Sequence, residues 1–238
     1  MIAFDDLTLA YDREPAVHHL TGRIDRGSLI ALVGPNGAGK TTLIRAIAGE
    51  PIASAEGGLS VDTRRIGWLP QQAEIDRAFP IDVAGFVAMG LWAKIGAFGA
   101  LGRKGRAQVA EALAAVGLPG FGARPLSALS GGQMQRVLFA RLMLQDAELC
   151  LLDEPFAAVD ARTTEGLTAL LLRWQAEGRT VVAVMHDLDL VRRTFPEALL
   201  IAREKIAQGP AREVLSEANL ARARLVLASD TARRRDAA

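Results

Sequence analysis

The strongest structural signal in this chain is the stretch Leu29-Ile-Ala-Leu-Val-Gly34-Pro-Asn-Gly-Ala-Gly-Lys40-Thr41-Thr42. It opens with five apolar residues in a row, which is the pattern of a strand buried on both faces. The loop that follows, residues 34–41, matches G-x-x-x-x-G-K-[ST], and helical spacing runs from Thr41 to Ala48. A strand, a glycine-rich loop and a helix in this order predict a phosphate-binding loop.

Phosphate chemistry accounts for the residue types in this loop. Glycines let the backbone come close enough for successive N–H groups to point at phosphate oxygens, and the helix start adds positive potential. Lys40 is expected to neutralise the β and γ phosphates, and Thr41 to offer its hydroxyl to Mg²⁺. A glycine-rich turn before an ordinary helix would not need lysine and threonine at these two positions. The predicted nucleotide-binding residues are Gly34, Pro35, Asn36, Gly37, Ala38, Gly39, Lys40, Thr41 and Thr42.

Two adjacent carboxylates end a second apolar run, Leu149-Cys-Leu-Leu-Asp153-Glu154. Asp153 is predicted to hold the Mg²⁺ shell, and Glu154 to polarise the water that attacks the γ-phosphate. These two roles require two carboxylates. An acid at the end of a strand that only capped the turn before Pro155 would require just one. The expected reaction is hydrolysis of a nucleoside triphosphate.

The pentapeptide Leu129-Ser130-Gly131-Gly132-Gln133 precedes a helical pattern and matches the signature of the ATP-binding-cassette (ABC) family, which the chain therefore resembles. Ser130 and the following N–H groups would form a second anion-binding helix start. The resemblance implies that this motif closes over ATP held by an opposing subunit. It therefore implies a head-to-tail homodimer, formed on ATP binding, with two composite sites.

Three other residues each match one position of the family pattern. Tyr11 resembles the aromatic residue that stacks on adenine, with a strand-edge tyrosine as the alternative. Gln71 resembles the glutamine that touches Mg²⁺ and water, and the adjacent Gln72 is the alternative. His186 resembles the switch histidine that contacts the γ-phosphate, or else a strand-end histidine. The implied catalytic set is Glu154, His186, Lys40 and Gln71, and the implied Mg²⁺ set is Thr41, Gln71 and Asp153.

The run Phe156-Ala-Ala-Val-Asp160 resembles the loop that crosses the dimer interface in this family. The family often has Ser-Ala-Leu-Asp here, and that serine is absent from this chain.

Periodicity and resemblance together predict an α/β fold of the ABC type, a P-loop nucleoside triphosphatase. Its central sheet is expected to be mainly parallel, with an antiparallel β layer and a helical subdomain at about residues 72–146. One ATPase domain is expected over residues 1–229, and a flexible tail over 230–238. The expected strands are residues 2–9, 20–24, 29–33, 148–152, 181–185 and 199–202; the expected helices are 41–48, 107–116, 132–145, 163–177 and from 213 onward.

The composition limits the cellular compartments and the kinds of partner that are expected for this chain. A net charge of +1 indicates no nucleic-acid partner, and one cysteine excludes an intramolecular disulfide. The amino terminus carries acids where a secretory signal would carry bases. Residues 83–102 are nearly all apolar, but they include Lys94 and lie between charged stretches, which favours an amphipathic or partner-docking segment over a membrane span. We expect a soluble chain on the cytoplasmic face of the cell membrane.

The run from Leu69 through Phe79-Pro80 to Trp92 resembles the ABC subfamily that imports zinc or manganese. That likeness implies two partners, an integral membrane permease and, indirectly, an external solute-binding protein. The single cysteine and three scattered histidines form no ligand cluster, so the chain itself need not hold the cargo. Import of ferric siderophore, haem or cobalamin is the alternative, and a non-transport ABC ATPase is the remaining one.

Overall fold

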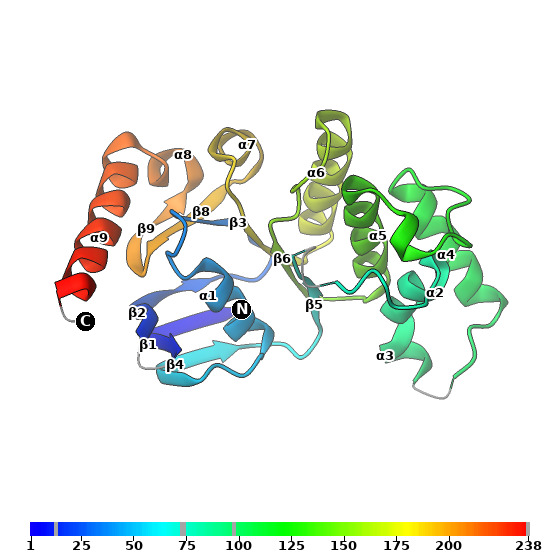
Figure 1. The fold of residues 1–238 in the computed structure, drawn as a ribbon, viewed down its shortest axis with the longest axis horizontal. Coiled ribbons are helices and arrows are strands. Elements are labelled where there is room, and N and C mark those ends of the chain that lie inside the picture. The colour runs from blue at the N-terminus through cyan, green and yellow to red at the C-terminus, as the bar shows by residue number, and fades with distance from the viewer. Residues whose placement is uncertain (12–13, 72–74, 97–98, 237–238) are drawn as a thin grey trace. The chain divides into compact units, whose positions relative to one another are not determined.

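The computed structural model describes residues 1–11, 14–71, 75–96 and 99–236. They form two compact units, of which the first combines Met1–Arg64 with Trp174–Ala238 and the second is Arg65–Arg173. The predicted α/β class is confirmed, because parallel strands, an antiparallel sheet and covering helices are all present (Figure 1).

An antiparallel sheet forms one layer of the first unit, with strand order β2-β1-β4. Strand β1 is Ile2–Tyr11, β2 is Glu14–Ile24 and β4 is Ser54–Val61. Strands β1 and β2 follow the two alternating apolar runs of the sequence, but both are longer than predicted. Strand β4 was not predicted, because its sequence, SAEGGLSV, has no apolar alternation and becomes a strand by pairing with β1.

Parallel strands form the second layer of this unit. Strand β3, Leu29–Val33, lies between β7, Thr180–Val184, and β8, Glu197–Ala202, and runs parallel to both. Every residue of β3 and β7 is buried, as the continuous apolar runs indicate. Strand β9, Glu204–Pro210, closes the edge antiparallel to β8.

The described residues of this unit include helices α1, α7, α8 and α9. Helix α1, Lys40–Ala48, follows β3, and α7, Leu188–Thr194, follows β7. The short α8, Ala211–Val214, leads into α9, Glu217–Asp236, which packs against β8 and β9 (Figure 1). Helix α9 thus extends into the segment for which the sequence suggested a flexible tail.

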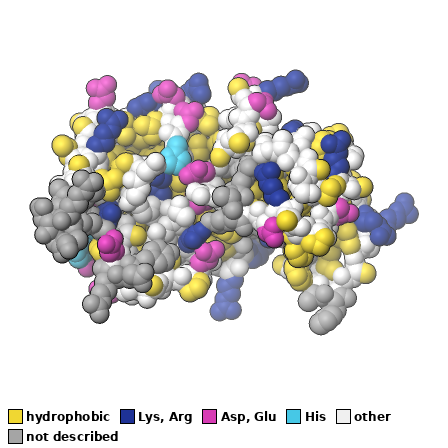
Figure 2. All heavy atoms as spheres, viewed as in Figure 1, with side chains coloured by type: hydrophobic (Ala, Val, Ile, Leu, Met, Phe, Trp, Pro, Cys, Tyr) yellow, Lys and Arg dark blue, Asp and Glu magenta, His cyan; other side chains and the backbone are white. Residues whose placement is uncertain are grey.

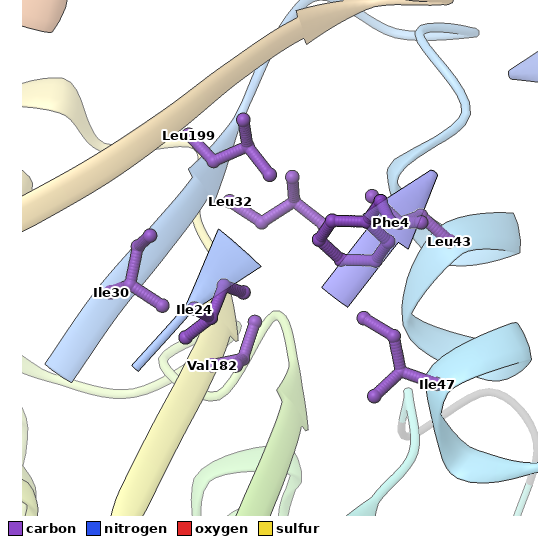
Figure 3. Close-up of a pocket in the computed structure, with 8 residues that line it drawn as sticks. All are labelled: Phe4, Ile24, Ile30, Leu32, Leu43, Ile47, Val182 and Leu199. Atoms are coloured by element: carbon purple, nitrogen blue, oxygen red, sulfur yellow. The ribbon is translucent and has the colours of Figure 1, made fainter. Parts of the chain in front are cut away.

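The core of the first unit joins its two layers through α1. Figure 3 shows apolar side chains from β1, β2, β3, α1, β7 and β8 converging around a space too small for a water molecule. This close packing fixes α1, and with it the loop that precedes α1, against both sheets. The converging side chains are Phe4, Ile24, Ile30, Leu32, Leu43, Ile47, Val182 and Leu199.

The second unit contains a parallel pair of strands and a set of helices. Strand β5, Ile66–Leu69, pairs with β6, Leu149–Asp153. The helices are α2 (Val83–Ala88), α3 (Trp92–Ile95), α4 (Arg103–Ala115), α5 (Gly131–Leu144) and α6 (Ala161–Ala176), with 3-10 turns at Met89–Leu91 and Leu126–Ala128. The predicted helical subdomain falls within this unit.

The apolar stretch 83–102 begins as two short helices with a 3-10 turn between them. Gly96 ends α3 with a φ of 76°, a conformation that L side chains rarely adopt. Among the residues that the structure describes, no helix has both the length and the apolar character needed to cross a membrane. On the face shown in Figure 2, basic and acidic side chains are interspersed, as expected for a net charge of +1.

Replacing a side chain of the Figure 3 cluster tests how much this core stabilises the first unit. Leu43 is 0% exposed, so Leu43→Ala should leave a cavity and lower the free energy of unfolding by about 2–5 kcal/mol. Urea denaturation measures the change. The matched control is Leu225→Ala, because Leu225 on α9 is 71% exposed and its truncation should change stability little. Equal losses in the two variants would contradict this description of the core.

Candidate functional site

The predicted phosphate-binding loop connects β3 to α1, as the sequence indicates. Gly39 occupies the N-cap position of α1, where no side chain caps the helix, and the first turn contains no acidic residue. The first N–H groups of α1 and the positive end of its dipole are therefore open to an anion.

Two glycines of this loop are required by close backbone contacts. A Cβ atom at Gly34 would lie 2.1 Å from the carbonyl oxygen of Ile201, and one at Gly39 would lie 2.3 Å from that of Ala16. Neither distance is compatible with a side chain. The loop is therefore held between the start of β2 and the end of β8, which fixes its curvature.

Lys40 lies folded over the same loop. Its side chain is almost fully buried, and Nζ donates hydrogen bonds to the carbonyl oxygens of Gly34 at 2.9 Å and Pro35 at 3.0 Å. The ammonium group is thus already placed at the loop that would surround the phosphates.

Strand register brings His186 to the same edge of the sheet as the loop. Leu32 of β3 pairs with Val184 of β7, and the N–H of Met185 donates to the carbonyl oxygen of Leu32 at 3.0 Å. Gly34 and His186 each lie two residues beyond this pair, at the carboxyl ends of parallel strands, where ligands of α/β sheets bind. His186 is exposed, and Asp187 caps the helix that follows it.

The same register argument applies to β5 and β6 in the second unit. Leu69 pairs with Leu152, and Gln71 and Glu154 each lie two residues further on. Gln71 Nε2 donates to Glu154 Oε1 at 3.1 Å. Glu154 has a φ of 51°, a left-handed conformation that is uncommon for a side-chain-bearing residue and recurs at functional sites. Asp153 ends β6 with its side chain buried, at 1% exposure.

The signature motif begins α5. Ser130 is the N-cap residue: its Oγ accepts from the N–H of Gln133 at 3.2 Å, while Gln133 Oε1 accepts from the N–H of Ser130 at 2.9 Å. This reciprocal pair is a capping box. A Cβ atom at Gly132 would lie 3.0 Å from the carbonyl oxygen of Ala158, so the motif packs closely on the loop that leads to Asp160.

Asp160 caps helix α6 in this structure. Its carboxylate accepts from the N–H and from the hydroxyl of Thr163, at 2.9 and 2.8 Å. These two hydrogen bonds, the backbone one first, hold the pKa of Asp160 below its ordinary value. The carboxylate is therefore ionised over the physiological pH range.

Three supporting contacts were not found by sequence reasoning. Gln135 is 1% exposed and donates to the carbonyl oxygen of Pro155, which ties α5 to the segment after Glu154. The rings of Phe139 and Phe156 stack at 6.4 Å across the same contact. A glutamine on an otherwise apolar helix face was the signal for Gln135. In addition, Arg77 Nη1 donates to the carbonyl oxygen of Leu129 at 3.2 Å, a contact with no local sequence signal.

The predicted residues therefore form two groups. The first unit holds the phosphate loop and His186, and the second holds Gln71, Asp153, Glu154 and the signature motif. Tyr11 ends β1, where its backbone pairs with Glu14. The alternative glutamine, Gln72, lies outside the described residues. The described residues contain no cluster of three or more histidine, cysteine or acidic residues that could hold a metal ion by themselves.

Comparison with known proteins identifies the family. The model of the ABC transporter family matches residues 17–157. The chain belongs to the ABC transporter family. The resemblance on the signature motif is thereby confirmed, and so is the prediction of an ABC-type ATPase fold.

Individual ABC relatives match over most of the chain. It is 40% identical to the zinc transport system ATP-binding protein TroB of Treponema pallidum, over 93% of this chain and 86% of that protein. It is 39% identical to the manganese transport system ATP-binding protein MntB of Bacillus subtilis, over 92% and 90%. Among solved structures, an inward-facing putative metal-chelate type ABC transporter matches with a TM-score of 0.79 and 28% identity, covering 92% of this chain and 86% of that one. A dimeric ATP-binding cassette bound to ADP and Pi matches with a TM-score of 0.79 and 25% identity, covering 89% and 99%.

Proposed function

We propose that this ABC ATPase is the motor subunit of an importer for zinc or manganese, acting as a nucleotide-sandwich homodimer on the cytoplasmic face of a membrane permease. The observation that carries the proposal is that one chain contains two helix starts suited to binding an anion. One, at α1, is uncapped and glycine-lined; the other, at α5, carries the ABC signature. Two such sites in one chain fit a nucleotide held between two copies.

The residues of the first group would bind ATP. The open N–H groups of α1 and the ammonium of Lys40 suit a chain of phosphates, and Tyr11 would stack on the base. His186 would contact the γ-phosphate from the neighbouring strand end. Mg²⁺ prefers oxygen ligands, and Thr41, Gln71 and the buried carboxylate of Asp153 would each supply one. A bound Mg²⁺ would neutralise phosphate charge.

Glu154 would polarise the attacking water. The carboxylate accepts from Gln71, which orients it, and the left-handed backbone places it at the end of β6. The task is one of positioning and electrostatics. Binding of ATP would close the dimer and hydrolysis would reopen it, so that differential affinity for two conformations moves the permease.

Glu154→Gln tests the catalytic role. The variant should keep ATP affinity while steady-state hydrolysis falls by about 10²–10⁴-fold, because the water loses its positioned base. With MgATP it should accumulate as a dimer in size-exclusion chromatography. Normal turnover in this variant would exclude Glu154 from the proposed role.

A second substitution, introduced into the Glu154→Gln variant, tests the composite site. Adding Ser130→Arg to Glu154→Gln should abolish the ATP-dependent dimer while each monomer still binds ATP through its own phosphate loop. Ser127→Arg is the matched control, because Ser127 is exposed three residues earlier and should leave the dimer intact. An ATP-dependent dimer that persists in the variant carrying Ser130→Arg would contradict the sandwich.

An apolar groove of about 270 Å³ in the second unit is the proposed docking site for a permease helix. Six of its lining residues are apolar, and Asp76 and Arg141 add one charge of each sign. Phe79 is 58% exposed, although it is a large apolar side chain. Family membership argues for this occupant, because the matched family is that of ABC transporters and the motor of a transporter acts on a membrane-spanning partner. The lining residues are Ile75, Asp76, Phe79, Ile81, Phe86, Met89, Leu126 and Arg141.

Phe79→Asp should uncouple the motor from the permease. It places a charge where an apolar helix would dock, so co-purification with the permease and cargo uptake should be lost, while the ATPase activity of the isolated chain stays unchanged. Leu172→Asp is the control: Leu172 on α6 is a large apolar residue that is 43% exposed and does not line the groove. Equal losses of uptake with both variants would count against the groove as the docking site.

The cargo is proposed from the named relatives, at 40% and 39% identity, which serve zinc and manganese. An external solute-binding protein would deliver the ion to the permease. The likeness to a putative metal-chelate type transporter favours a second candidate, import of a chelate such as ferric siderophore, haem or cobalamin. Zinc or manganese remains the preferred cargo, because identity to those relatives is higher.

Uptake by vesicles that contain the whole transporter distinguishes the two cargoes. Radioactive zinc or manganese should accumulate in an ATP-dependent manner, and Lys40→Ala should abolish accumulation. A metal chelate should neither accumulate nor compete. Uptake of the chelate without the free ion would reverse the assignment, and ATP-dependent uptake of neither would exclude both.

A further inference from the structure

The end of β8 and the turn that follows it contact the phosphate loop at two points. The carbonyl oxygen of Ile201 packs so closely on Gly34 that a Cβ atom there would lie at 2.1 Å. The N–H of Arg203 donates to the carbonyl oxygen of Ala38 at 3.0 Å. Both contacts are made by backbone atoms, so neither depends on the side chain at position 203.

Arg203 also contacts β2. Its carbonyl oxygen accepts from the N–H of His18 at 2.8 Å, and its Nη1 donates to the carbonyl oxygen of Pro15 at 3.0 Å. Pro15 is adjacent to Glu14, which pairs with Tyr11 at the end of the β1–β2 ladder. The guanidinium group therefore holds the end of the strand pair that carries Tyr11.

The backbone of Arg203 is strained as well. Its φ of 63° lies in the left-handed region, which an arginine seldom adopts. Such a conformation persists where surrounding contacts over-determine it, and it recurs at sites that position ligands. Here three hydrogen bonds, from the N–H, to the C=O and from the guanidinium, constrain one residue.

We propose that Arg203 is a positioning residue for nucleotide recognition, which fixes the Tyr11 end of β1 and β2 relative to the phosphate loop. The base and the phosphates of one nucleotide are then bound together. Arg203 acts through the backbone of Pro15 and does not touch the nucleotide. The inference rests on the proposed role of this loop in binding ATP. Ala16, which follows Pro15, also packs on Gly39 of the phosphate loop, so the proposal predicts that the guanidinium supports recognition of the base more than recognition of the phosphates.

Comparison of MgATP with inorganic tripolyphosphate tests this separation. In Arg203→Ala the affinity for MgATP should fall about tenfold, the scale of one charged hydrogen bond, while tripolyphosphate binding changes less than about twofold. Arg203→Lys should restore part of the difference, because an ammonium group can donate to Pro15. The control is Arg23→Ala, since Arg23 also lies on β2 but pairs with the exposed Asp25. It should bind both ligands as the wild type does.

A double-mutant cycle with Tyr11→Ala supplies a second readout. If Arg203 acts through the Tyr11 segment, Arg203→Ala should cost little further MgATP affinity once Tyr11 is truncated. Additive losses, or equal losses for MgATP and tripolyphosphate, would mean that Arg203 only supports the fold, and would overturn the proposal. Wild-type protein that binds neither ligand would instead overturn the proposed ATPase site, so the two failures are distinguishable.

Discussion

The register of parallel strand pairs is the constraint on which the candidate site depends. In the first unit, Leu32 aligned with Val184 places the residues that follow β3 and β7 at one edge of that strand pair. In the second unit, Leu69 aligned with Leu152 does the same for the residues that follow β5 and β6. A slip of one residue would turn every side chain to the opposite face of the sheet. Burial resists such a slip, because β3, β6 and β7 are buried along their whole length and must pack on both sides. Apolar strands therefore determine where polar residues meet.

Elements whose signal is local could be predicted from the sequence. Strand β3, the phosphate loop and the start of α5 follow from short runs in which residue type and conformation are tightly linked. Strands β4 and β9 could not be predicted, because Ser54–Val61 and Glu204–Pro210 lack strand alternation and gain their structure by pairing with β1 and β8. Pairing with a neighbour overrides intrinsic preference in such strands.

The candidate site shows the same difference between features with a local sequence signal and features that depend on distant segments. Its residue types could be predicted, because each belongs to a short motif whose chemistry can be inferred from that segment alone. These residues are Lys40, Ser130, Asp153 and Glu154. The contacts between segments could not be predicted. The hydrogen bond from Gln71 to Glu154 joins residues on separate strands, and the contact of Arg203 with Pro15 joins positions near opposite ends of the sequence. Such contacts depend on the folded arrangement of distant segments.

The capping box of α5 leaves part of the hydrogen-bonding capacity of Ser130 available. A hydroxyl group has one proton and two lone pairs, and the Ser130 oxygen accepts from the N–H of Gln133. The hydroxyl proton takes no part in the capping box, in which Ser130 contributes only its oxygen and its backbone N–H. An oxygen atom of an incoming phosphate could therefore accept this proton while the serine still caps its own helix. One side chain can thus stabilise the helix start and donate to a ligand at the same time.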